Sequence, residues 1–315
     1  MAVDDCGRVR RHALLRHAAL VQRRASRLDP VLRGLMWSAA AGLVFTLLNT
    51  TMRLLTLELH PFQVQFLRYL CSLLVMMPLI ARAGFASYRP NNIASQFSRG
   101  AVHTVGLVLW FSALPFVSMA DTTAIAFIGP IFIMIGAAWF FGERMRWDRW
   151  MGAVIGFAGV LIVVAPKINS AGAGAYTLLM LASSPVFAAS FLMTKALTRS
   201  ERPTVIVAWQ SVSISLFSLP LALFAWRWPS VVQWLAFLMC GLLGSVAHYC
   251  LTRSFSVADI SATQSVKFLD LVWASLLGWL VFADIPSRST LIGGVVICAS
   301  TLWIARREAR VVAPR

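Results

Sequence analysis

The stretch Ser256–Pro286, SVADISATQSVKFLDLVWASLLGWLVFADIP, is apolar for long enough to cross a bilayer, yet it carries Lys267 and Asp270 within it. An ionised side chain at membrane depth costs about 2.5–3.5 kcal/mol on insertion scales, so such residues usually face protein or a wet cavity. The two opposite charges are three residues apart, a spacing that lets them pair on one helical face. Thr263 and Gln264, about one turn earlier, share that face. The sequence therefore predicts a polar stripe on an apolar helix that the rest of the chain encloses.

The composition places the chain among polytopic helical membrane proteins. Of its 315 residues, 59% are hydrophobic and only 13% are charged, and the mean hydropathy is +0.75. Apolar runs of about 20 residues, the length that crosses a bilayer as a helix, recur along the chain. A soluble core cannot absorb so many apolar stretches, so we expect an all-α integral membrane protein.

The apolar runs predict ten transmembrane helices. They cover roughly residues 33–55, 61–82, 99–117, 121–141, 148–166, 174–196, 204–226, 231–252, 260–282 and 288–305. Several are separated by very short turns, so neighbouring spans should be antiparallel. We expect four parts: an N-terminal tail over 1–30, five-helix repeats over 31–168 and 172–308, and a C-terminal tail over 309–315.

The formal net charge of +16 records membrane topology rather than a nucleic-acid partner. Arginines crowd residues 8–33, and most of the other basic residues fall on the same side of the predicted bundle. The loops and tail on that side would hold Arg82, Arg89, Arg99, Arg144, Arg146, Arg149, Lys195, Arg199, Arg202, Arg253, Arg306, Arg307, Arg310 and Arg315. The opposite side holds only Arg53, Lys167, Arg227 and Arg288. This asymmetry predicts a multi-pass protein of the cell (inner) membrane with both termini in the cytoplasm.

The Arg-rich segment 1–30 is too broken by charge to be a signal-peptide core. We expect a cytoplasmic tail, with an amphipathic helix that lies on anionic membrane lipid.

An internal repeat is visible at the ends of the fourth and ninth spans. Phe-Gly-Glu at 141–143 matches Phe-Ala-Asp at 282–284, and Gly152 and Gly293 follow the two acids at the same distance. Five spans per half is an odd number, so the two halves must have opposite orientations. Inverted repeats are typical of secondary transporters, whose solute site lies near the midplane between the halves.

The order of several motifs supports a family resemblance. They are His60-Pro61-Phe62 to Arg68, Arg99-Gly100, Asp121 through Pro130 to Arg144, Gly152 to Pro166, Ala258-Asp259, Leu271 to Ala274, Leu276 to Gly278, Phe282 to Pro286, and Leu291 to Glu308. Together they resemble the drug/metabolite transporter superfamily, specifically ten-span proteins with two EamA-type domains. The resemblance covers about residues 31–308. It implies transport, including export, of metabolites or amino-acid-like solutes.

The chain departs from that family pattern at one place. Related sequences tend to carry an acid near position 267 and an arginine near position 270, whereas here the order is Lys267 and Asp270. The exchanged pair still satisfies both charges. It reverses the local polarity of any site there, so a relative's solute does not transfer directly.

Seven polar or aromatic residues within the spans are candidates for the solute path. They are Lys267, Asp270, Gln264, Arg68, Trp110, His103 and Asn49. Lys267 and Asp270 form either a structural ion pair or a site that binds a charged group or exchanges protons. Arg68 has three alternatives: it binds an anionic group, pairs with Glu58 or Asp270, or extends to the membrane interface.

For His103 and Asn49, as for Gln210, His248 and Tyr249, interhelical hydrogen bonding or interfacial anchoring is the main alternative. Gln264 and Trp110 are favoured for the path, because Gln264 shares the charged face and Trp110 lies mid-span.

Other residues predict structure rather than a site. Pro130 should kink the fourth span or loosen its hydrogen bonding. Gly152, Gly156 and Gly159 give the fifth span a flat face for close helix packing. Glu143 and Asp284 are expected to be partners of nearby arginines.

Enzymatic chemistry is disfavoured. The sequence has no Gly-rich phosphate loop, no metal ligands at a usable spacing and no Ser/His/Asp set at a membrane surface, so neither a metal nor an organic cofactor is expected. The five cysteines are scattered and predict no disulfide framework.

The sequence therefore predicts a secondary transporter of small polar or amphipathic metabolites, an exporter among the alternatives, that works by alternating access with or without proton coupling. Spans one to four and six to nine should surround the cavity, and spans five and ten should support it or form a homodimer contact. The main alternative is a membrane-embedded binding or assembly subunit that transports nothing itself. An intramembrane enzyme is a second alternative.

Overall fold

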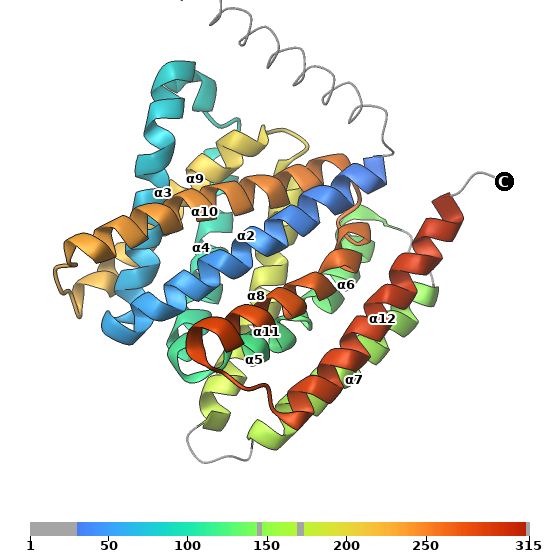
Figure 1. Ribbon diagram of the computed structural model, residues 1–315. Helices are drawn as coiled ribbons and strands as arrows, with labels where there is room; N and C mark the ends of the chain where they lie inside the picture. Colours follow the sequence, from blue (N-terminus) through green and yellow to red (C-terminus); the bar gives the residue numbers. More distant parts are fainter. Residues whose placement is uncertain (1–29, 144–146, 169–172, 313–315) are drawn as a thin grey trace, which may run out of the picture.

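The computed structural model describes residues 30–143, 147–168 and 173–312, and all regular structure in these ranges is helical (Figure 1). In chain order the elements are α2 (Pro30–Glu58), α3 (Pro61–Ala83), η1 (Phe85–Tyr88), α4 (Ile93–Ala113), η2 (Leu114–Phe116), α5 (Met119–Ala126), α6 (Gly129–Phe141), α7 (Trp147–Ile168), α8 (Ala173–Leu197), α9 (Pro203–Leu223), α10 (Val231–Val257), η3 (Ala262–Val266), α11 (Phe268–Phe282) and α12 (Arg288–Val312).

Among the residues that the structure describes, six helical segments are long and apolar enough to cross a membrane. They are Pro30–Glu58, Pro61–Ala83, Ala124–Phe141, Gly174–Leu197, Pro203–Leu223 and Val231–Val257. Large apolar side chains cover the outside of the bundle: Trp139, Phe224 and Ile285 are each more than four-fifths exposed. Because lipid solvates apolar surface as well as a protein core does, this exposure fits a membrane protein.

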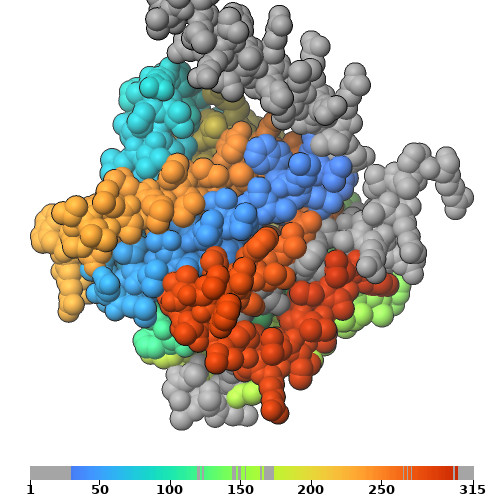
Figure 2. All heavy atoms as spheres, viewed as in Figure 1, coloured from blue at the N-terminus to red at the C-terminus, as the bar shows by residue number. Residues whose placement is uncertain are grey.

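The helices pack mainly as four pairs. The most extensive contacts join α2 to α10, α7 to α12, α4 to α8 and α3 to α9. Figure 1 shows α12 lying along α7 at one edge, and Figure 2 shows α2 filling the space between α10 and α11. Each of these pairs combines one helix from the first half of the chain with one from the second.

Close packing between the halves depends on small residues. A Cβ at Gly241 of α10 would lie between 2.5 and 2.7 Å from backbone atoms of Cys71 and Ser72 of α3. In α7, a Cβ at Gly159 would lie 2.9 Å from the carbonyl oxygen of Gly293 of α12. The small-residue face predicted for the fifth span therefore packs against α12 of the same chain.

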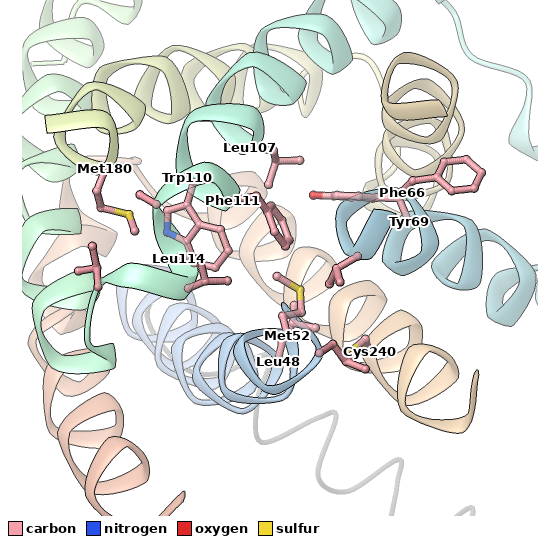
Figure 3. Close-up of a cluster of buried hydrophobic side chains, with 14 of the residues drawn as sticks. Leu48, Met52, Phe66, Tyr69, Leu107, Trp110, Phe111, Leu114, Met180 and Cys240 are labelled. Atoms are coloured by element: carbon pink, nitrogen blue, oxygen red, sulfur yellow. The ribbon is translucent and has the colours of Figure 1, made fainter. Parts of the chain in front are cut away.

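The core lies around α2, α3, α4 and α10. Figure 3 shows part of it, with Leu48 and Met52 of α2 between Phe111 of α4 and Cys240 of α10. These four side chains are almost completely buried.

The fourth span is broken before Pro130. The helix α5 ends at Ala126, and α6 begins at Gly129 with the proline in its first turn. Proline fits there because its missing N–H would have no partner at that position. The break lies where the kink was expected.

The ninth span is also broken, which corrects the prediction of a continuous helix over residues 260–282. A 3-10 turn, η3, precedes α11, and Lys267 is both the C-cap of η3 and the N-cap of α11. The side chains of Thr263 and Gln264 both donate to the carbonyl oxygen of Ile260, at 2.8 and 2.9 Å. Such side-chain bonds compete with the regular helix ladder.

Both broken spans end in the same way. Gly142 after α6 and Ala283 after α11 adopt positive φ angles of 65° and 51°, and an acid follows each of them. The Phe-Gly-Glu and Phe-Ala-Asp repeat thus corresponds to two left-handed helix caps.

Candidate functional site

A cavity of about 220 Å³ lies where the two broken spans meet. Its lining includes Ala126 and Gly129 beside one break and Gln264 and Lys267 beside the other. All seven residues selected from the sequence also line it: Lys267, Asp270, Gln264, Arg68, Trp110, His103 and Asn49. Residues that are up to 221 positions apart in the sequence thus line one cavity.

The ion pair expected in the ninth span is present. Lys267 Nζ lies 3.5 Å from Asp270 Oδ2, and each side chain is about one-fifth exposed. Asp270 occupies the first turn of α11, where the positive end of the helix dipole stabilises a carboxylate. The carboxylate packs directly against Gly42 of α2, where an added Cβ would overlap it. The position of the Asp270 carboxylate is therefore set by the start of α11 and by the close approach of α2.

Arg68 of α3 is buried inside the bundle, with only 3% of its surface exposed. Its Nη2 lies 3.3 Å from Nε2 of His248, and its guanidinium lies 4.2 Å from the centroid of the Tyr69 ring. Neither partner is an acid: Glu58 instead accepts a hydrogen bond from Gln233. Burial rules out extension to the interface, one of the three alternatives for this side chain, and within the described ranges Arg68 forms no ion pair with Asp270.

His103 connects three helices at the cavity wall. Its Nδ1 lies 2.9 Å from Oγ of Ser190 on α8, and its Nε2 lies 3.2 Å from the hydroxyl of Tyr69 on α3. The interhelical hydrogen bonding that was the alternative for this residue is therefore present, and the side chain lines the cavity as well.

The position of Arg99 differs from the one predicted from the sequence. It was placed in a loop, but α4 begins at Ile93, capped by Asn92, so Arg99 lies in the second turn and is 2% exposed. Its Nε donates to Thr194 at 2.9 Å and its Nη2 donates to Gln210 at 2.5 Å. The amide of Gln210 in turn lies 3.2 Å from the ring nitrogens of His248, which joins Arg99 to the cavity wall.

Aromatic rings form much of the remaining lining. These are Phe45, Trp110, Phe127, Phe187 and Phe191. The Phe187 and Phe191 rings lie nearly parallel, 6.4 Å apart. In Figure 3, Trp110 and Met180 point toward one another from α4 and α8.

The sequence analysis placed the sixth span, α8, around the cavity but selected none of its residues. Ser183, Ser184, Phe187 and Phe191 all line the cavity. The Ser-Ser-Pro sequence at 183–185, which interrupts an apolar run, is the signal that could have pointed to this span.

Comparison with known proteins now gives the family. The model of the EamA-like transporter family matches residues 32–165 and again residues 175–306. The chain belongs to the EamA-like transporter family. A riboflavin transporter of Rhizobium johnstonii is 33% identical over 280 residues, which cover 88% of this chain and 92% of that protein.

More distant relatives span similar lengths. An S-adenosylmethionine uptake transporter of Rickettsia prowazekii is 26% identical, with 89% of this chain and 95% of that protein covered. The pseudopaline exporter CntI of Pseudomonas aeruginosa is 24% identical, with 89% and 99% covered. One solved crystal structure superposes with a TM-score of 0.67 at 20% identity, covering 88% of this chain and 99% of the other. The chain is therefore a multi-pass membrane protein and a small-molecule transporter.

The two EamA-matching segments meet at the cavity, and each contributes one broken span to it. They are also joined at the two ends of the bundle. At the end where α2 finishes, Arg53 forms an ion pair with Asp284 and lies 4.2 Å from the centroid of the Phe282 ring. Asp284 therefore has the arginine partner that the sequence analysis expected.

The opposite end of this EamA protein is held by Glu143. Its carboxylate accepts from the backbone N–H groups of Ile260 and Ser261, both at 3.3 Å, and from the Ser261 hydroxyl at 2.5 Å. Beside it, Lys195 donates to the carbonyl oxygens of Phe255 and Ala258. Glu143 thus binds the start of the ninth span, a role that the sequence analysis did not anticipate. Lys195, assigned to a loop from the sequence, belongs to α8.

Proposed function

We propose that the chain is a secondary transporter that carries a small polar or amphipathic metabolite through this cavity by alternating access. The observation that carries the proposal is the meeting of two broken spans, one from each EamA-matching segment, at one cavity lined by ionised and aromatic side chains. Discontinuous helices at a repeat interface are the usual place for solute sites in secondary transporters.

The packing of the helices supports ten spans arranged as two inverted five-helix repeats. In such an arrangement α2 corresponds to α8, α3 to α9, α4 to α10, the α5–α6 span to α11, and α7 to α12. Exchanging the two halves then turns the contact between α2 and α10 into the contact between α8 and α4, which is also present. The pairs α3 with α9 and α7 with α12 map onto themselves. This self-consistent pattern is what a pseudo-twofold axis between the halves produces. With the positive-inside rule, it leaves both termini on the cytoplasmic side of the cell membrane.

The contacts at the two ends of the bundle would act as gates. Arg53 with Asp284 forms the outer gate, and Glu143 with Ser261 forms the inner gate. Glu143 and Asp284 occupy equivalent places in the repeat, each after a left-handed cap. Closing one gate while the other opens would expose the cavity alternately to the two sides, and solute or proton gradients would set the direction, import or export.

Charge reversal at the outer gate tests this mechanism. Asp284→Arg or Arg53→Asp alone places like charges together and opposes closure, so we expect transport to fall about tenfold, corresponding to about 1.4 kcal/mol between the two states. The double exchange restores opposite charges and should recover the rate to within about threefold. Initial transport rates per folded protein measure the effect, with the exposed Arg82→Glu of α3 as control. A double variant no better than either single would contradict the gate.

The solute class is inferred from the lining and from the relatives. Riboflavin and S-adenosylmethionine, named for two of the relatives, each join a flat nitrogen heterocycle to a hydroxylated chain or sugar. The aromatic walls offer stacking surfaces for such a ring, and Asn49, Ser183, Ser184 and Gln264 offer polar contacts for the rest. We therefore propose a solute with a planar heterocycle and a polar chain, and flavins are the first class of compound to test.

Flux measurements in reconstituted vesicles test the function. Vesicles that contain the purified protein should accumulate or release riboflavin or another heterocyclic solute faster than protein-free vesicles, and imposed pH gradients should reveal any proton coupling. Absence of flux for every solute, in both directions and with every gradient, would contradict transport. Stoichiometric co-purification with a partner protein would then favour the binding-subunit alternative.

A further inference from the structure

Arg68 brings a positive charge to the cavity lining without a carboxylate partner in the described part of the chain. A guanidinium has five N–H donors. Among the described residues, only Nη2 has a hydrogen-bond partner, the ring of His248, and the buried Nε has none. Most of the hydrogen-bonding capacity of this almost fully buried side chain is therefore unused.

The neighbouring charges do not compensate Arg68. Lys267 and Asp270 pair with each other and together contribute no net charge. Arg99, the other buried arginine nearby, bonds to the neutral groups of Thr194 and Gln210, and its Nη1 is unpaired. The surroundings of the cavity thus carry an excess of positive charge. A buried cation without compensation is costly, and a bound anion removes that cost.

We propose that the transported solute carries an anionic group, a carboxylate or a phosphate, which Arg68 binds inside the cavity. The planar guanidinium matches either group through two parallel hydrogen bonds. This inference rests on the proposed function in one respect only: the cavity is the solute site.

Two flavins that differ by one phosphate test the proposal. Riboflavin and riboflavin 5′-phosphate share the ring and the hydroxylated chain, and both are fluorescent, so their binding to the purified full chain can be titrated directly. A charge-assisted contact predicts that the phosphate ester binds about ten- to a hundredfold more tightly. Arg68→Gln should abolish that preference, so that the dissociation constants of the two flavins become equal to within about twofold. Arg82→Gln, which removes an exposed arginine of the same helix, should change neither.

Small anions separate this inference from the choice of a flavin. Inorganic phosphate and benzoate, at constant ionic strength, should raise the melting temperature of the wild-type protein and of Arg82→Gln but not that of Arg68→Gln. If neither flavin binds but this stabilisation depends on Arg68, the flavin is wrong and the anion site stands. Equal binding of the two flavins that Arg68→Gln leaves unchanged would overturn the anion site and leave the cavity as a solute site. If no anionic probe binds the wild type, the inference also fails.

Should Arg68→Gln not fold, Arg68→Lys, which keeps the charge without the planar fork, should bind the phosphate ester more weakly than the wild type does.

Discussion

Replacing Lys267 by methionine and Asp270 by asparagine in the same chain should give a folded protein that no longer transports. Removing both charges leaves no unpaired ion, so stability should change little, and replacement of a paired set by neutral groups is often neutral. Lys267→Met alone instead leaves Asp270 without its partner at 3.5 Å and should cost about 3 kcal/mol of folding free energy. We expect transport to fall about a hundredfold in both, because the polar contacts at the break are lost.

Thermal unfolding and vesicle flux, measured on the same preparations, separate the two alternatives for this pair. A structural pair gives an unstable single variant and a stable, active double variant. A pair in the solute path gives a stable double variant without activity. Glu58→Gln is a suitable control, because it alters an exposed acid whose bond to Gln233 a glutamine side chain can keep. Wild-type flux in the double variant would rule out a direct role for the pair.

Filling the cavity at Gly129 should block transport without disturbing the fold. A Cβ added at this residue meets no atom within 4 Å, and the residue lines the cavity. Gly129→Phe therefore places a ring in open space where the solute would bind, and transport should fall at least about a hundredfold. The melting temperature should stay the same or rise slightly, since glycine is a poor helix former.

A graded series at this position gives the internal control. Gly129→Ala adds one methyl group and should keep most of the activity, Gly129→Leu should be intermediate, and Gly129→Phe should be inactive. Val154→Phe, on the exposed face of α7, adds the same ring outside the cavity and should transport normally. Normal flux in Gly129→Phe would place the solute path elsewhere.

Much of the candidate site was predictable because intramembrane charged residues are few. Lys267, Asp270 and Arg68 stand out against apolar surroundings, and the cost of exposing them to lipid requires that they face inward. Their inward direction brings them to one cavity with Trp110 and His103. Whether the solute touches these side chains remains a prediction.

The remaining features could not be predicted from single spans. The 3-10 segment before Lys267 is accompanied by side-chain bonds from Thr263 and Gln264 to Ile260, which the apolar pattern of the span does not reveal. Arg99 was placed in a loop because hydropathy puts the start of α4 too late, whereas a buried network with Gln210 and Thr194 holds its charge inside. Such partners come from other helices, so only the packing identifies them.

The most direct test of the account is a structure of the protein determined with a transported solute bound. We predict that the solute will lie between the starts of α6 and α11, in contact with Trp110 and with its anionic group at Arg68. A solute bound outside this cavity, for example in the crevice between α11 and α12 near Val272 and Val295, would contradict the account.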